Sequence, residues 1–142
     1  MTAIVYRDGV MAADSVAMNY GVRVPCHPKI TRKGDGTLIG VSAHEAPARW
    51  FSDAWPDIDR DKAPPLTEGD FYALIVKPNG DCLSCDHHLV PFPLKGDFHV
   101  LGRCGQFLLG ALHHGASAAE AVRLAIEHTT EVGGPIQIER LK

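Results

Sequence analysis

Two short apolar runs separated by an Asp-Gly turn open the chain, and they constrain its fold more than any other feature. Residues 3–6 and 10–13 flank Arg7-Asp8-Gly9, and an Asp-Gly pair between such runs is a strong signal for a β-hairpin. A second hairpin is predicted in residues 73–86, where Asn79-Gly80 divides two further runs. Because hairpins pair neighbouring strands in opposite directions, the chain is expected to build antiparallel sheets.

Helical spacing of apolar residues appears in three later segments. It marks residues 44–55, which end before Pro56, a residue that cannot continue a helix. Residues 106–115 and 117–128 indicate two more helices, and the second opens with a capping box, Ser117-Ala118-Ala119-Glu120. Further strands are predicted at residues 21–24, 37–41, 98–100 and 136–141.

The order of these elements predicts the fold class. Strands, a helix, strands, two helices and a final strand indicate a layered α+β fold in which helices cover antiparallel sheets. The charged stretch 57–70 is too short to separate domains, and 142 residues is the length of one ordinary domain. We therefore expect a single domain spanning residues 1–142.

Composition and charge exclude several classes of function. With 17 acidic and 14 basic residues the chain has a net charge of −3, so it lacks the basic excess that binds nucleic acid. No run approaches the roughly eighteen apolar residues of a membrane span, and the N-terminus lacks the features of a signal peptide. The expectation is a cytoplasmic protein without nucleic-acid or membrane partners, in which disulfides are disfavoured.

Thr2 follows the initiator methionine directly. If Met1 is removed, Thr2 carries a hydroxyl and a free α-amine on one residue, which supplies a nucleophile together with a base. An α-amine has a pKa of about 7.7 to 8.0 and is partly neutral at cytoplasmic pH. A surface or terminal role is the alternative for a threonine at this position.

Five stretches, taken in order, carry a resemblance to a known family. They are "TAIVYRDGVMAADS", "HPKI", "GVSAHEAPA", "IVKPNGD" and "GASAAEAVRLAIEHTTEVGGPIQI". The chain resembles the proteasome β subunit and the bacterial HslV peptidase. This resemblance implies the N-terminal nucleophile (Ntn) hydrolase fold, a layered α/β/β/α sandwich, and hydrolysis of peptide or amide bonds by a threonine.

The resemblance also implies roles for individual residues. Thr2 falls at the nucleophile position, Asp14 at the supporting carboxylate and Lys29 at the lysine near the nucleophile. Backbone N–H groups at the turn near Ala43 would hold the oxyanion of an acyl intermediate. Relative to HslV, the opening hairpin has lost two residues from each arm, which preserves the face of each side chain, and Thr2 is expected opposite Asp14.

The resemblance further implies a homo-oligomer in which Thr2 faces an enclosed chamber, with a peptide or protein as substrate. It leaves open whether an ATPase partner exists. The compact length would suit a phage or prophage member of the family.

Two segments depart from the family pattern. Where the family has Gly-Ser-Gly, this chain has Gly102-Arg103-Cys104-Gly105, and the later Asp-x-x-Ser-Gly-Gly segment is altered to "TTEVGG". Arg103 and Cys104 are therefore the candidate supporting residues at the first segment. A cysteine at a helix start could also act as a nucleophile, although a buried structural cysteine is the alternative. These departures keep a second function open, an inactive proteasome-like assembly or structural protein.

The stretch "CLSCDHH" provides a rival site. Cys82, Cys85, His87 and His88 resemble half of a zinc site, which would make the chain a metal-binding module. However, residues three apart on a strand point to opposite faces, and the sequence has no second Cys-x-x-Cys to complete four ligands. We therefore expect neither a metal nor another cofactor.

Overall fold

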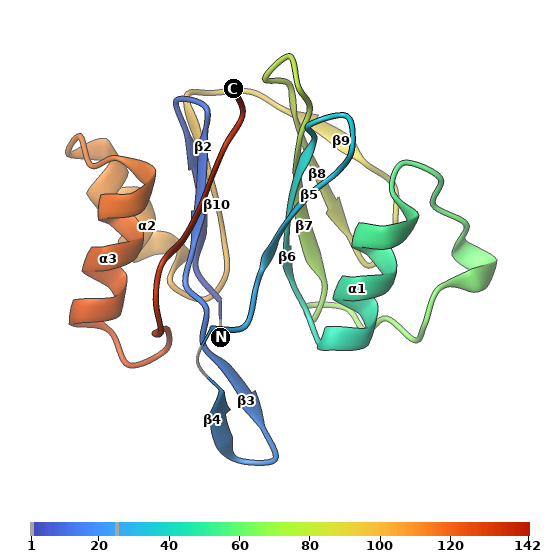
Figure 1. Ribbon diagram of the computed structural model, residues 1–142, viewed down its shortest axis with the longest axis horizontal. Helices are drawn as coiled ribbons and strands as arrows, with labels where there is room; N and C mark the ends of the chain where they lie inside the picture. Colours follow the sequence, from blue (N-terminus) through green and yellow to red (C-terminus); the bar gives the residue numbers. More distant parts are fainter. Residues whose placement is uncertain (1, 25) are drawn as a thin grey trace.

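The computed structural model describes residues 2–24 and 26–142, and two antiparallel sheets form its centre (Figure 1). The first sheet has four strands in the order β10-β1-β2-β11. Its strands are β1 (Ile4–Arg7), β2 (Val10–Ala13), β10 (Phe98–Leu101) and β11 (Gln137–Arg140). Asp8 and Gly9 join β1 to β2 with φ values of 51° and 76°, as a type I′ turn requires. The predicted opening hairpin is confirmed.

The second sheet has five strands in the order β5-β6-β7-β8-β9. Its strands are β5 (Ile30–Arg32), β6 (Leu38–Ser42), β7 (Tyr72–Val76), β8 (Cys82–Asp86) and β9 (Phe92–Leu94). The predicted hairpin of residues 73–86 is the β7–β8 pair. The edge strand β9 contains Pro93, which an edge tolerates because its outward-facing groups need no ladder partner.

The helices lie on the outer sides of the two sheets (Figure 1). They are α1 (Glu45–Ala54), α2 (Gly105–His113) and α3 (Ala118–His128), with a short 3-10 turn at Arg60–Lys62. A small hairpin of β3 (Ala17–Asn19) and β4 (Val22–Val24) projects beyond the sheets. Within the described ranges, none of the helices has the length and apolar character needed to cross a membrane.

Three apolar clusters hold these elements together. Alternate residues of β1 point in opposite directions, so Val5 packs toward α2 and α3, whereas Ile4 packs between the two sheets. A third cluster, which includes Phe51 of α1, covers the other face of the five-stranded sheet. Gly40 lets the sheets approach closely, because a Cβ there would lie 2.9 Å from Cγ2 of Ile4.

The sequence missed three strands, namely β3, β5 and β9. Each has only three residues, which is too short for alternation of apolar and polar residues to be recognised. Strand β5 lies in a polar stretch of sequence and forms because β6 pairs with it. The helices at residues 44–55, 106–115 and 117–128 are confirmed to within one or two residues at their ends.

The cap of α3 supports a first prediction. The Ser117 side chain accepts a hydrogen bond from the Glu120 N–H, and the Glu120 carboxylate accepts one from the Ser117 N–H, both at 3.1 Å. Ser117→Ala is therefore expected to lower the free energy of unfolding by about 1 kcal/mol, measured by urea denaturation. Ser117→Asp, which can also cap, should restore most of that loss. Equal stability of the alanine variant and the parent chain would contradict this role.

Candidate active site

Three residues that the sequence placed in the site lie together where the two sheets meet. Asp14 directly follows β2, and Lys29 directly precedes β5. The Lys29 Nζ lies 2.9 Å from Oδ1 of Asp14 and 3.5 Å from Oγ1 of Thr2. The side chains of this ion pair are 6% and 0% exposed for Lys29 and Asp14. The lysine ammonium therefore connects the threonine hydroxyl to a fully buried carboxylate.

The Asp14 carboxylate has hydrogen-bond partners on both oxygens. Oδ1 accepts a hydrogen bond from the Ala3 N–H at 2.9 Å, in addition to its contact with Lys29. Oδ2 accepts one from the Gly133 N–H at 3.3 Å. A buried charge is costly unless it is paired and hydrogen-bonded, and this carboxylate meets both conditions.

The backbone of Lys29 is attached to both sheets. Its N–H donates to Oε1 of Gln137 in β11 at 2.8 Å. Its carbonyl accepts a hydrogen bond from the Val41 N–H in β6 at 3.2 Å. The Gln137 side chain also donates to the Ile30 carbonyl at 2.9 Å. The Lys29 backbone, from which the ammonium extends, is therefore fixed by one strand from each sheet.

Burial and charge act on Lys29 in opposite directions. Removal from water lowers the pKa of Lys29, and this is the larger effect, while the charge and hydrogen bond of Asp14 raise it. The net pKa lies below the ordinary value for lysine. Asp14 therefore favours the charged ammonium at a position where burial opposes it.

The backbone of Thr2 lies close against Gly102. Thr2 is only 6% exposed. Gly102 follows β10 with a φ of 105°, and a Cβ there would lie 1.7 Å from the Thr2 carbonyl oxygen. Only glycine permits this approach, so the turn after β10 sets the position of the Thr2 backbone.

Two solved structures resemble the chain over nearly its whole length. Thiobacillus denitrificans BPH, solved in complex with epoxomicin, is 20% identical, with a TM-score of 0.68 and coverage of 99% of this chain and 98% of that chain. Eukaryotic HslV from Trypanosoma brucei is 13% identical, with a TM-score of 0.67 and coverage of 98% of both chains. The chain has the HslV-type, proteasome-like fold. In sequence, no family model and no curated protein matches it.

The HslV-type fold was predicted from the order of five short stretches, but one detail of the hairpin was wrong. The partners of β1 and β2, such as Ile4 and Ala13, place Asp14 opposite Ala3 and not opposite Thr2. The Asp14 N–H accordingly donates to the Ala3 carbonyl at 3.1 Å. Asp14 thus approaches the Thr2 hydroxyl through Lys29 and not through direct cross-strand pairing.

The residues predicted to support the site lie at the start of α2. Arg103 is exposed, and Cys104 is buried at the N-cap of α2. Cys104 Sγ lies 3.6 Å from Oγ1 of Thr129. Because the Thr129 hydroxyl donates to the Ala125 carbonyl, the thiol is the donor in this contact. The two segments that depart from the family pattern therefore touch each other, and they border a hollow of about 400 Å³ next to Gly102.

Ala43 lies in the bend between β6 and α1, one residue before the N-cap His44. Val41, two residues earlier, bonds to the Lys29 carbonyl. The bend predicted to supply oxyanion N–H groups is thus connected through β6 to the lysine of the site.

Sequence reasoning missed Gly102, Gly133 and Gln137 as parts of this site. The first two lie within the altered segments and contribute backbone atoms, which no side-chain motif reveals. Gln137 comes from the last strand and had no spacing that connected it to Lys29. A glycine that ends a strand, as Gly102 does, was the one available signal.

Proposed function

We propose that the chain, once Met1 is removed, is a threonine-type Ntn hydrolase that acts on peptide or amide bonds. The observation that carries this proposal is the contact of Lys29 Nζ with both the Thr2 hydroxyl and the buried Asp14 carboxylate. The fold shared with HslV supports it. The proposed unit is a single domain with the α/β/β/α layering of that class, which the three apolar clusters support.

The proposed reaction proceeds in two steps. The Thr2 hydroxyl attacks the carbonyl carbon of the substrate, and the α-amine of the same residue takes its proton. The C–N bond of the substrate then breaks, the leaving amine takes that proton, and an ester with Thr2 remains. Water hydrolyses the ester in the second step and regenerates the hydroxyl.

Lys29 and Ala43 have electrostatic roles in this proposal. The Lys29 ammonium lies 3.5 Å from the reacting oxygen, so its charge stabilises the developing alkoxide and favours the neutral α-amine. Backbone N–H groups in the bend at Ala43 stabilise the oxyanion of the tetrahedral intermediate. Asp14 is a positioning residue that keeps the ammonium charged and in place.

Assembly is part of the same proposal. We infer a homo-oligomer that encloses Thr2 and admits a peptide or protein substrate. Size-exclusion chromatography with light scattering would measure the number of subunits.

The proposal predicts a single covalent adduct with epoxomicin, the compound in the Thiobacillus denitrificans BPH structure. Intact mass spectrometry of the purified protein should show loss of Met1 and a gain of one epoxomicin per chain. The adduct should be absent from Thr2→Ala, whose circular dichroism spectrum should match that of the parent chain. Retention of Met1 would contradict the N-terminal mechanism, because the α-amine would then belong to the wrong residue.

A second candidate function is an inactive assembly protein with the same fold. The observation that favours it is the pair of altered segments, in which exposed Arg103 stands at the predicted serine position and Cys104 contacts Thr129. Loss of Met1 without an adduct, in a chain that still forms an oligomer, would select this function over the hydrolase.

A further inference from the structure

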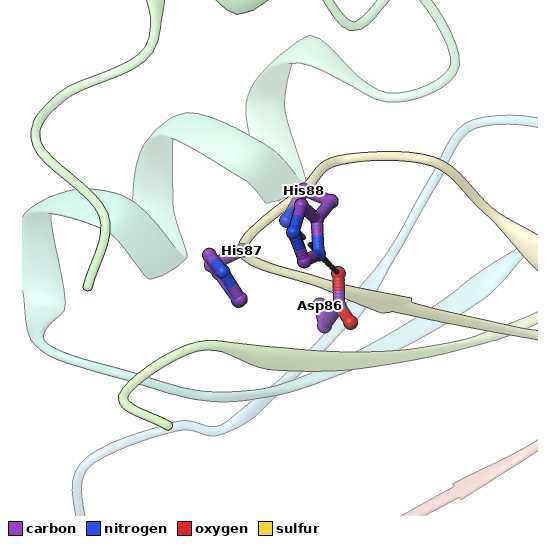
Figure 2. Close-up of side chains that lie close together, drawn as sticks. All are labelled: Asp86, His87 and His88. Carbon is purple, nitrogen blue, oxygen red and sulfur yellow. Dashed lines mark hydrogen bonds and ion pairs between the residues drawn. The ribbon is translucent and has the colours of Figure 1, made fainter. Parts of the chain in front are cut away.

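Three consecutive side chains with metal-ligand chemistry gather at the end of β8 (Figure 2). Asp86 is the last residue of β8, and His87 and His88 follow it. One ligand atom from each lies within 4.8 Å of the other two. The imidazole ring centroids of the two histidines are 4.0 Å apart. This cluster uses none of the groups of the Thr2 site.

The turn that carries these residues is well fixed. Oδ1 of Asp86 accepts a hydrogen bond from the His88 N–H at 2.9 Å, and the Asp86 carbonyl accepts one from the Leu89 N–H at 2.9 Å. The Leu89 side chain is 7% exposed and packs in the cluster with Phe51, which anchors the end of the turn. Because the backbone is already ordered, gathering the ligands requires only side-chain rotation.

The donor atoms suit a divalent metal ion whose ligand preference lies between hard and soft, such as Zn²⁺. Two imidazole nitrogens with one carboxylate oxygen form a three-ligand set of the kind that binds Zn²⁺ with an open position, and imidazole also suits Cu²⁺ and Ni²⁺. Ligand atoms around tetrahedral zinc are roughly 3.3 Å apart, given bond lengths of about 2.0 Å. The His88 side chain is 69% exposed and Nδ1 lies 3.2 Å from Oδ1 of Asp86, so small rotations close the set.

The neighbouring cysteines do not belong to this set. Cys82 packs between the two sheets, whereas Cys85 packs on the opposite face with α1, as the spacing of three residues predicted. The half-zinc-site interpretation of "CLSCDHH" is therefore replaced by one that uses only its last three residues.

We propose that Asp86, His87 and His88 bind one divalent transition-metal ion of the zinc class, separately from the Thr2 site. Strand pairing connects the proposed site to the bend at Ala43. Asp86 pairs with Tyr72, and Tyr72 pairs with Ser42. Two strand spacings of about 4.8 Å separate the backbone of Asp86 from that of Ser42 at the end of β6, where the Ala43 bend begins.

The test is a calorimetric titration of the untagged protein with ZnCl₂. The parent chain is expected to bind one equivalent, and His87→Ala and His88→Ala are each expected to bind at least roughly tenfold more weakly. His128→Ala is the matched control. His128 is also exposed and lies beside a carboxylate, with Nε2 3.9 Å from a Glu127 oxygen. Among the described residues, however, it belongs to no cluster of three potential metal ligands. Its affinity should equal that of the parent chain.

Asp86 both provides a proposed metal ligand and accepts the hydrogen bond that stabilises the turn, and Asp86→Asn distinguishes these two roles. Its amide oxygen can still accept the His88 N–H, but it lacks the carboxylate charge, so zinc affinity should fall while the circular dichroism spectrum stays unchanged. A Co²⁺ titration should give a visible absorption band in the parent chain that is absent from His87→Ala. The proposal is overturned if the parent chain binds no zinc, or if His87→Ala and His88→Ala bind it as tightly as the parent.

Discussion

Lys29→Met is expected to abolish the reaction with epoxomicin and to lower the free energy of unfolding by about 3 kcal/mol. The side chains of the Lys29–Asp14 pair are 6% and 0% exposed, so removing the ammonium leaves a buried carboxylate without its cation. Breaking one partner of a buried ion pair is strongly destabilising for this reason. Reaction with epoxomicin is lost for a separate reason, because the charge 3.5 Å from the Thr2 hydroxyl is gone.

A double variant separates these two effects. Lys29→Met combined with Asp14→Asn removes both charges; the asparagine oxygen can still accept the Ala3 N–H, and only the longer 3.3 Å bond from the Gly133 N–H is lost. This double variant should be more stable than Lys29→Met alone but equally unreactive, as measured by urea denaturation and by intact mass. Arg49→Met is the control, since the Arg49–Glu45 pair is 71% and 59% exposed and should change stability by only about 0.5 kcal/mol. A Lys29→Met chain that forms the adduct at the parent rate would refute the role of the lysine.

Gly102→Ala is the second substitution with a large expected effect. The added Cβ would lie 1.7 Å from the Thr2 carbonyl oxygen, and the φ of 105° disfavours any other residue. The backbone fixes the position of a Cβ and the carbonyl oxygen is itself a backbone atom, so no side-chain rotation relieves the contact. We expect a loss of about 3 kcal/mol or more in the free energy of unfolding, with displacement of Thr2.

A glycine in the adjacent helix is the matched control for this substitution. Gly110 in α2 has nothing within 4 Å of an added Cβ, so Gly110→Ala should stabilise the protein by up to about 1 kcal/mol through helix propensity. Thermal denaturation of the two variants compares them directly. Equal midpoints for Gly102→Ala and the parent chain would show that Thr2 is not held by this turn.

The part of the site that the sequence predicted rests on local signals. Asp8-Gly9 specifies the opening hairpin, and the hairpin brings Asp14 back beside the start of the chain. The resemblance assigned site roles to Thr2, Asp14 and Lys29, and the structure places Lys29 against the other two. These residues were accessible because each lies in or next to a short motif.

The rest of the site depends on contacts between segments far apart in sequence. Gly133 reaches Asp14 across 119 positions, and Gln137 reaches Lys29 across 108. Periodicity and turn signals describe only neighbouring residues, so they give no information on these pairs. The register error at Asp14 has a similar origin, because the length of each hairpin arm was inferred from an alignment of motifs and not from hydrogen bonding.

The attachment of Lys29 to β11 also has a consequence for the timing of folding. Residues 133–137 leave the ribosome long after residues 2–29, whereas a domain generally folds as a unit. Until β11 docks, Lys29 lacks Gln137 and the Asp14 carboxylate lacks Gly133. The Lys29–Asp14 pair beside Thr2 therefore gains its full set of hydrogen bonds only after the last strand of the chain has docked.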